Sequence, residues 1–207
     1  ETVEAIRKKA DMVIEVSTGG VSGLNIQQRC APLEYSMVEL ASLNVGSINL
    51  GEAVYQNPLQ DVRYCMEQIK KHRIIPDIEV FELGMIHSVL ELQKEIPFDT
   101  KALYSIVLGH FGAAPANMNA LWSLKQALPQ GALWGITHFG RKDYDIMAAA
   151  VAMGADALRI GFEDSNYLDE RTQVESNAPL IARAVQMIEG IGHRAATAQE
   201  ARQMLGK

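Results

Sequence analysis

The sequence has few cysteines, and it lacks the signatures of several common protein classes. Its 207 residues include two cysteines, Cys30 and Cys65. They are far apart and form no CxxC pair, so neither a disulfide framework nor a thiolate metal site is indicated. No apolar run reaches the roughly 20 residues of a membrane span, and no signal peptide is visible. No GxGxxG or P-loop motif follows a predicted strand, which argues against dinucleotide-binding and P-loop folds.

The sequence also lacks a strong excess of acidic or basic residues. Charged residues make up 21% of the chain, the formal net charge is -6, and acidic and basic residues are interspersed. This balance gives no support to a nucleic-acid-binding or membrane-binding surface. With 48% hydrophobic residues, the composition predicts a cytoplasmic globular protein with a single domain over residues 1–207.

The chain begins with Glu1 rather than Met, and residues 1–10 have the spacing of an amphipathic helix. Val3, Ile6 and Ala10 form its apolar stripe. We therefore expect the sequence to start part-way through a longer protein.

Six predicted strands alternate with predicted helices along the chain. The strands start near residues 12, 43, 77, 105, 132 and 156. Such alternation requires crossover connections and predicts a parallel sheet. Two architectures fit this pattern: an open doubly wound sheet, and part of a (β/α)8 TIM barrel. Polar residues at the strand ends favour the barrel, whose sites are built at its carboxyl face. We expect this α/β chain to hold strands three to eight of such a barrel.

The last predicted strand, within residues 155–164, carries charge where a buried strand normally has none. Alternation places Arg159 and Glu163 on one face, opposite an apolar face formed by Leu158, Ile160 and Phe162. Asp164 follows where the strand is expected to end. Because an unpaired buried ion is strongly unfavourable, these charges indicate either a functional site or a structural ion pair.

Several segments carry a resemblance to a known family by their order and spacing. They are STGG (17–20), ASLNVGSIN (41–49), PDIEVF (76–81), VLG (107–109), RIGFED (159–164), NAPL (177–180) and AATAQEAR (195–202). Together they resemble the β-keto acid cleavage enzymes, whose founding member cleaves 3-keto-5-aminohexanoate in lysine fermentation. The resemblance runs from about residue 3 to the C-terminus.

The resemblance implies a barrel with a divalent metal, usually zinc, at its carboxyl face. The implied reaction takes two small-molecule partners, a 3-oxo acid and acetyl-CoA, to acetoacetate and a new acyl-CoA. In the family, two histidines of an HxH motif on the second strand and a glutamate on the eighth hold the metal. The glutamate matches Glu163, and we expect the two histidines upstream of residue 1.

The resemblance also implies roles for individual residues. Arg159 matches the arginine that stabilises oxyanion charge, and Asp164 matches the base that deprotonates the α-carbon of the keto acid. Ser17 and Gly20 match residues that bind the substrate carboxylate, and Ser42 is the nearest match to a hydroxyl residue with the same role. Members of the family usually form tetramers, which implies a homo-oligomer.

The sequence leaves two other interpretations open. One is a metal-dependent aldolase or lyase with the same barrel, acting without CoA. The other is an inactive barrel fragment. His110 and His138 follow the fourth and fifth predicted strands, and we expect them to line the substrate pocket rather than to bind metal.

Overall fold

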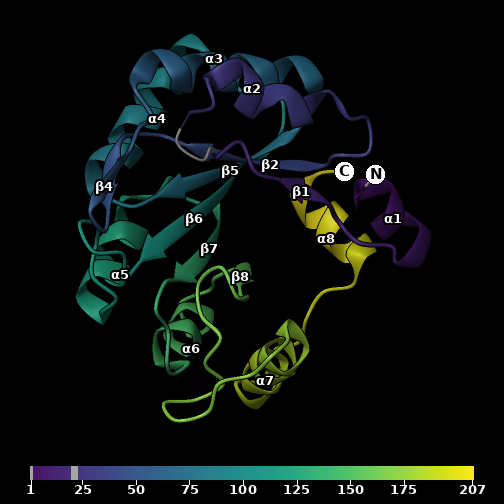
Figure 1. The fold of residues 1–207 in the computed structure, drawn as a ribbon, viewed down its shortest axis with the longest axis vertical. Helices are drawn as coiled ribbons and strands as arrows, with labels where there is room; N and C mark the ends of the chain where they lie inside the picture. The colour runs from purple at the N-terminus through teal and green to yellow at the C-terminus, as the bar shows by residue number, and fades with distance from the viewer. Residues whose placement is uncertain (1, 20–22) are drawn as a thin grey trace.

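The structure is a computed structural model that describes residues 2–19 and 23–207. Six parallel strands form its main sheet, in the order β1-β2-β5-β6-β7-β8. Their bounds are β1 (Glu15–Val16), β2 (Leu40–Asn44), β5 (Ile75–Val80), β6 (Leu103–Leu108), β7 (Leu133–His138) and β8 (Ala157–Arg159). The sheet curves, and helices cover its outer side (Figure 1). This arrangement is part of a barrel, because a doubly wound sheet has helices on both faces.

The helices follow the predicted alternation. They are α1 (Thr2–Lys9), α2 (Ile26–Cys30), α3 (Leu59–His72), α4 (Leu83–Glu95), α5 (Met118–Ala127), α6 (Asp145–Ala152), α7 (Asn177–Gly190) and α8 (Ala198–Leu205). The helix α3 has a buried apolar stripe that includes Val62, Met66 and Ile69. Arg73 ends this helix in the left-handed region, with φ 53, and its N–H donates to the last carbonyls of the helix. Within the described residues, no helix is long and apolar enough to cross a bilayer.

The strand predicted to start near residue 43 begins earlier, at Leu40, and it does not continue through residues 45–50. β2 ends at Asn44, and the chain then forms an antiparallel hairpin of β3 (Ile48–Leu50) and β4 (Ala53–Tyr55). Gly51 has φ 63, which suits the tight turn between these two strands. Ahead of β2, a short 3-10 helix (Ala31–Glu34) follows α2, and β2 begins at Leu40.

The last strand is shorter than predicted. β8 ends at Arg159, and the backbone N–H groups of Asp164 and Ser165 donate to the carbonyl of Gly161 at 3.1 and 3.0 Å. The strand alternation therefore stops before Phe162, which is 44% exposed instead of lying on an apolar face. This turn carries Glu163 and Asp164 over the carboxyl end of the sheet.

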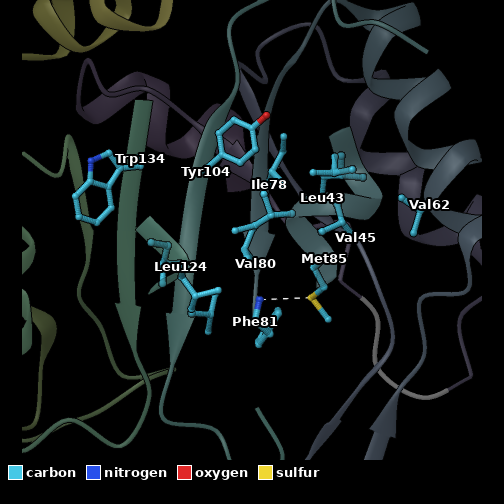
Figure 2. Close-up of a cluster of buried hydrophobic side chains, with 14 of the residues drawn as sticks. Leu43, Val45, Val62, Ile78, Val80, Phe81, Met85, Tyr104, Leu124 and Trp134 are labelled. Carbon is cyan, nitrogen blue, oxygen red and sulfur yellow. Dashed lines mark hydrogen bonds between the residues drawn. The ribbon is translucent and has the colours of Figure 1, made fainter. Parts of the chain in front are cut away.

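The main core lies between the sheet and the outer helices. Figure 2 shows strand side chains such as Leu43, Ile78 and Val80 packing beside Val62 of α3 and Met85 of α4. Ile78 and Val80 are fully buried, and burial of each such side chain contributes about 1.5–3 kcal/mol. The alternate residues of these strands face the barrel interior.

The amino end of the interior is closed by apolar packing. Leu40, Ile75 and Leu103 form a buried layer there, and Leu205 of α8 packs against it. Arg202 of the same helix donates from Nε to Glu39 at 2.7 Å, which anchors the helix just ahead of β2. The interior therefore opens toward the carboxyl ends of the strands, where barrel enzymes place their sites.

Candidate functional site

An arginine–aspartate pair stands at the carboxyl end of β8. Arg159 donates from Nε and Nη2 to the two carboxylate oxygens of Asp164, both at 2.8 Å. The carbonyl of Asp164 accepts the N–H of Gly140 at 2.9 Å, which ties the turn to the loop after β7. Asp164 is 7% exposed. The bidentate geometry fixes the carboxylate in one orientation.

Arg159 contacts two further carboxylates. Its Nη1 donates to Glu79 of β5 at 3.4 Å, and its Nη2 lies 3.3 Å from Glu163. Burial lowers the pKa of Arg159, but the hydrogen bond to Asp164 and the charges of all three carboxylates outweigh burial and raise it above its ordinary value. The guanidinium is therefore a permanent positive charge at this end of the barrel.

Two carboxylates of β5 lie beneath Arg159 inside the barrel. Asp77 accepts a hydrogen bond from Ser105 at 2.6 Å, and it pairs in register with Ser42 as Glu79 pairs with Asn44. Burial, together with the charge of Asp77, raises the pKa of Glu79 to about 7, although Arg159 opposes this shift. Burial also raises the pKa of Asp77 to about 6. Near neutral pH, Glu79 is therefore only partly ionised.

The loop after β1 is held by Ser42. The N–H of Thr18 donates to the Ser42 hydroxyl at 3.0 Å, and the Thr18 hydroxyl donates to the Ser42 carbonyl at 2.6 Å. The Ser17 hydroxyl oxygen accepts the N–H of Gly19 at 3.0 Å. Both serines keep a hydroxyl proton that can be donated to a ligand. The fourth residue predicted for this loop, Gly20, lies outside the described residues.

A cavity of about 1010 Å³ brings these groups together. It is lined by residues from the carboxyl ends of several strands, including all the described residues predicted for the site: Ser17, Ser42, Arg159, Glu163 and Asp164. Glu15, Asp77 and Glu79 also line it. Alternation along the predicted strands indicates that Glu15 and Glu79 face the barrel interior, but no sequence pattern gives any of the three a catalytic role.

The two histidines after β6 and β7 are placed differently. His110 lines the cavity, and its ring stacks on Phe139 with centroids 3.9 Å apart and planes at 17°. Burial lowers the pKa of His110, which favours the neutral ring. The prediction for His138 is wrong, because among the described residues His110 is the one histidine that lines the cavity. The His138 ring instead lies over Gly109, where a Cβ would come within 3.3 Å of its Cδ2 atom.

Glu163, the candidate metal ligand, is accessible, but it does not belong to a complete set of metal ligands among the described residues. The side chain of Glu163 is 82% exposed and faces the cavity, so its carboxylate can accept a further partner. Within residues 2–19 and 23–207, however, no group of three or more His, Cys, Asp or Glu side chains is placed to hold a metal ion. A catalytic zinc needs about three protein ligands. The described residues therefore do not make a complete metal site.

The chain is similar to one protein family over nearly its whole length. A family model described as beta-keto acid cleavage enzyme matches residues 1–206. The 3-keto-5-aminohexanoate cleavage enzyme of Fusobacterium nucleatum is 33% identical over 205 residues, which cover 98% of this chain and 74% of that protein. The 3-oxoadipate:acetyl-CoA acetyltransferase of Cupriavidus necator is 32% identical over 209 residues, which cover 99% of this chain and 72% of that protein.

Solved structures of ObcA share the fold. The apo structure aligns with a TM-score of 0.80 at 16% identity, over 97% of this chain and 52% of that one. The ternary complex of ObcA with a C4-CoA adduct and oxalate aligns with a TM-score of 0.82 at 16% identity, over 100% of this chain and 55% of that one. The chain thus spans about half the length of these solved structures.

Proposed function

The chain belongs to the beta-keto acid cleavage enzyme family, and on that premise we propose that it carries the reacting groups of an acyltransferase. The substrates are a 3-oxo acid and acetyl-CoA, and the products are acetoacetate and a new acyl-CoA. The observation that carries the proposal is the Arg159–Asp164 pair, which faces a cavity at the carboxyl end of a parallel sheet. The acetyl-CoA acetyltransferase of C. necator supports the choice of co-substrate.

We also propose how this chain fits into a complete barrel. We take the six strands to be strands three to eight of a (β/α)8 barrel, in one domain over residues 1–207. Their consecutive parallel order and the apolar layer under α8 support this assignment. The enzyme is further proposed to act as a cytoplasmic homo-oligomer, a tetramer as the family resemblance implies.

Asp164 is the proposed base. Carbon acids next to a 3-oxo group lose a proton to a well-placed carboxylate. Two hydrogen bonds from Arg159 fix the direction of the Asp164 carboxylate. After proton transfer, the α-carbon of the keto acid attacks the acetyl thioester. The Arg159 guanidinium then faces the oxyanion that develops, and a fixed positive charge is well suited to stabilise it.

The loop after β1 is the proposed site for the substrate carboxylate. The hydroxyls of Ser17 and Ser42 lie at the cavity wall, and each can donate one hydrogen bond to a carboxylate oxygen. Gly20 is assigned to the same site by the family resemblance. Because Ser42 also holds Thr18, it has a structural role in addition to the proposed binding role.

The proposal of a zinc ion rests on Glu163 and on the family resemblance. A divalent metal would supply Lewis-acid chemistry at a carbonyl oxygen, and Glu163 would be one of its ligands. The other two ligands are the histidines that we expect upstream of residue 1. No step above depends on the metal, because the described residues offer one suitable ligand rather than three.

The test is product formation with matched variants. Protein incubated with a panel of 3-oxo acids and acetyl-CoA should release acetoacetate, detected by mass spectrometry, and Asp164→Asn should slow this release at least about 100-fold. Consumption of a 3-oxo acid at the same rate without acetyl-CoA would favour an aldolase or lyase and would overturn the proposal.

A further inference from the structure

The turn that carries Asp164 is joined to the loop after β7 at two consecutive residues. The Asp164 carbonyl accepts the N–H of Gly140 at 2.9 Å, and the hydroxyl of the next residue, Ser165, donates to the carbonyl of Arg141. Because β8 ends at Arg159, the turn lies beyond the hydrogen-bond ladder that β8 forms with β7. The two contacts therefore continue the connection between β7 and the β8 segment past the end of the sheet.

The loop after β7 is itself fixed to the barrel. The N–H of Phe139 donates to the Leu108 carbonyl at 2.9 Å, which ties the start of the loop to the end of β6. The Arg141 side chain is 2% exposed, and its Cζ atom lies 4.1 Å from the centre of the Tyr144 ring. The Tyr144 hydroxyl donates to the Leu180 carbonyl of α7 at 3.3 Å. Close packing around so large a buried side chain restricts the backbone that carries it, so the Arg141 carbonyl is a fixed acceptor.

The hydrogen bonds of Ser165 act on the turn rather than on a ligand. Ser165 is 8% exposed and lies outside the cavity lining. Its hydroxyl donates to the Arg141 carbonyl and accepts the N–H of Tyr167 at 3.1 Å, while its own N–H donates to the Gly161 carbonyl at 3.0 Å. A serine hydroxyl has one proton to donate, so Ser165 has none left for a substrate.

We propose that Ser165 is a positioning residue, whose bond to Arg141 holds the Asp164 carboxylate where it takes the proton from the 3-oxo acid. The inference rests on the proposed function, in which Asp164 is the base. Arg159 fixes the direction of the carboxylate, and the Ser165 bond fixes the backbone that carries it. Both restraints matter, because a displacement of about 1 Å in an active site can slow a reaction about 100-fold.

Ser165→Ala tests the proposal through the split between kcat and KM. Of the two contacts with the loop after β7, the turn then keeps the one from Gly140, so kcat should fall about 10- to 100-fold. The KM for the 3-oxo acid should stay within about twofold of wild type, because Ser17 and Ser42 are unchanged. Rates are compared per mole of folded protein, below the melting temperature of the variant, so that a loss of stability does not contribute.

Two further variants separate positioning from stability. Ser165→Thr keeps the hydroxyl and should recover most of the lost kcat. Thr100→Val removes a hydroxyl that donates to the Ile74 carbonyl at 3.4 Å, outside the cavity lining, and should leave kcat unchanged. A kcat for Ser165→Ala within about twofold of wild type would overturn the proposal. An equal fall in kcat for Thr100→Val would overturn it as well, because the loss would not be specific to the turn.

The hold on the turn is also measured without reference to activity. Hydrogen–deuterium exchange of the Gly140 amide, followed by NMR, reports its bond to the Asp164 carbonyl. In Ser165→Ala this amide should exchange at least about 10-fold faster than in wild type, and Thr100→Val should not change its rate. Unchanged exchange in Ser165→Ala would overturn the positioning role. If the wild type turns over no 3-oxo acid, the proposed function fails, and the exchange rate still decides whether Ser165 holds the turn.

Discussion

Both carboxylate oxygens of Asp164 accept hydrogen bonds from Arg159, which lies five residues earlier in the chain. The pair exists because β8 ends at Arg159 and the following turn brings Asp164 back over it. The arrangement satisfies a buried carboxylate and also aims it at the cavity. An ion pair that only closed the end of the sheet would not need to line the cavity, as Arg159 and Asp164 do.

Asp164→Asn tests the proposed base. The amide keeps the shape of the side chain but cannot accept a proton, so kcat should fall about 10²- to 10⁴-fold. Steady-state kinetics with the best 3-oxo acid measures the effect. Asp99→Asn changes an exposed aspartate outside the cavity lining, and it should leave kcat unchanged. A kcat for Asp164→Asn within about twofold of wild type would exclude Asp164 as the base.

Arg159→Met tests the contribution of the pair to stability. The variant leaves Asp164 as a buried charge without its bidentate partner, so the free energy of unfolding should fall by about 2–3 kcal/mol. This is less than for a fully buried pair, because the Arg159 side chain is 41% exposed. Urea unfolding measures the loss. Arg159→Met/Asp164→Leu should recover most of it, and failure to recover would assign the loss to packing.

Glu163→Gln tests the metal ligand. Metal analysis of the full-length protein should show a clear loss of bound zinc in this variant, because an amide is a poor ligand for zinc. The melting temperature measured without metal should not change, since the side chain is 82% exposed. Glu170→Gln, at an exposed position, is the matched control. Equal zinc content in Glu163→Gln and wild type would remove Glu163 from the site.

Ser42→Ala tests the support of the loop after β1. The variant removes the acceptor of the Thr18 N–H, and an unpaired buried donor costs about 1–3 kcal/mol. Both the free energy of unfolding and the affinity for the 3-oxo acid should therefore fall. Ser88→Ala removes an exposed hydroxyl on α4 and should change neither. An unchanged KM for Ser42→Ala would leave Ser42 with the structural role alone.

The raised pKa of Glu79 predicts a pH dependence of stability. An unfolded glutamate titrates near 4.5, whereas folding raises the pKa of Glu79 to about 7. The folded state therefore binds more protons between these values, and the contribution of Glu79 to stability falls as pH rises from 4.5 to 7. Glu79→Gln should gain stability relative to wild type by up to about 3 kcal/mol between pH 5 and pH 8. Urea unfolding at several pH values checks this, with Glu95→Gln as an exposed control.

The strand–helix alternation could be predicted because each element has its own local pattern. The hairpin β3–β4 could not, because residues 43–50 resemble a single strand that is interrupted only by Gly46. The pairing of residues 48–50 with Ala53–Tyr55 depends on a turn at Gly51 that looked like a strand end. The early end of β8 was missed for a similar reason, since residues 157–163 continue to alternate in the sequence.

The candidate site was predictable where its residues are close in the sequence. Arg159, Glu163 and Asp164 fall in one segment, and the structure brings them together. The contact between Arg159 and Glu79 joins residues 80 positions apart, and it depends on the curvature of the sheet across several strands. No pattern within a short stretch of sequence can indicate a contact between residues so far apart.

The most direct test of the account is the fate of the acetyl group. In the proposed reaction, the α-carbon of the 3-oxo acid displaces CoA from the acetyl thioester, and cleavage then returns CoA to the other acyl fragment. With acetyl-CoA that carries ¹³C in both acetyl carbons, C3 and C4 of the acetoacetate should be labelled and the new acyl-CoA should be unlabelled. Unlabelled acetoacetate, or labelled acyl-CoA product, would contradict the account.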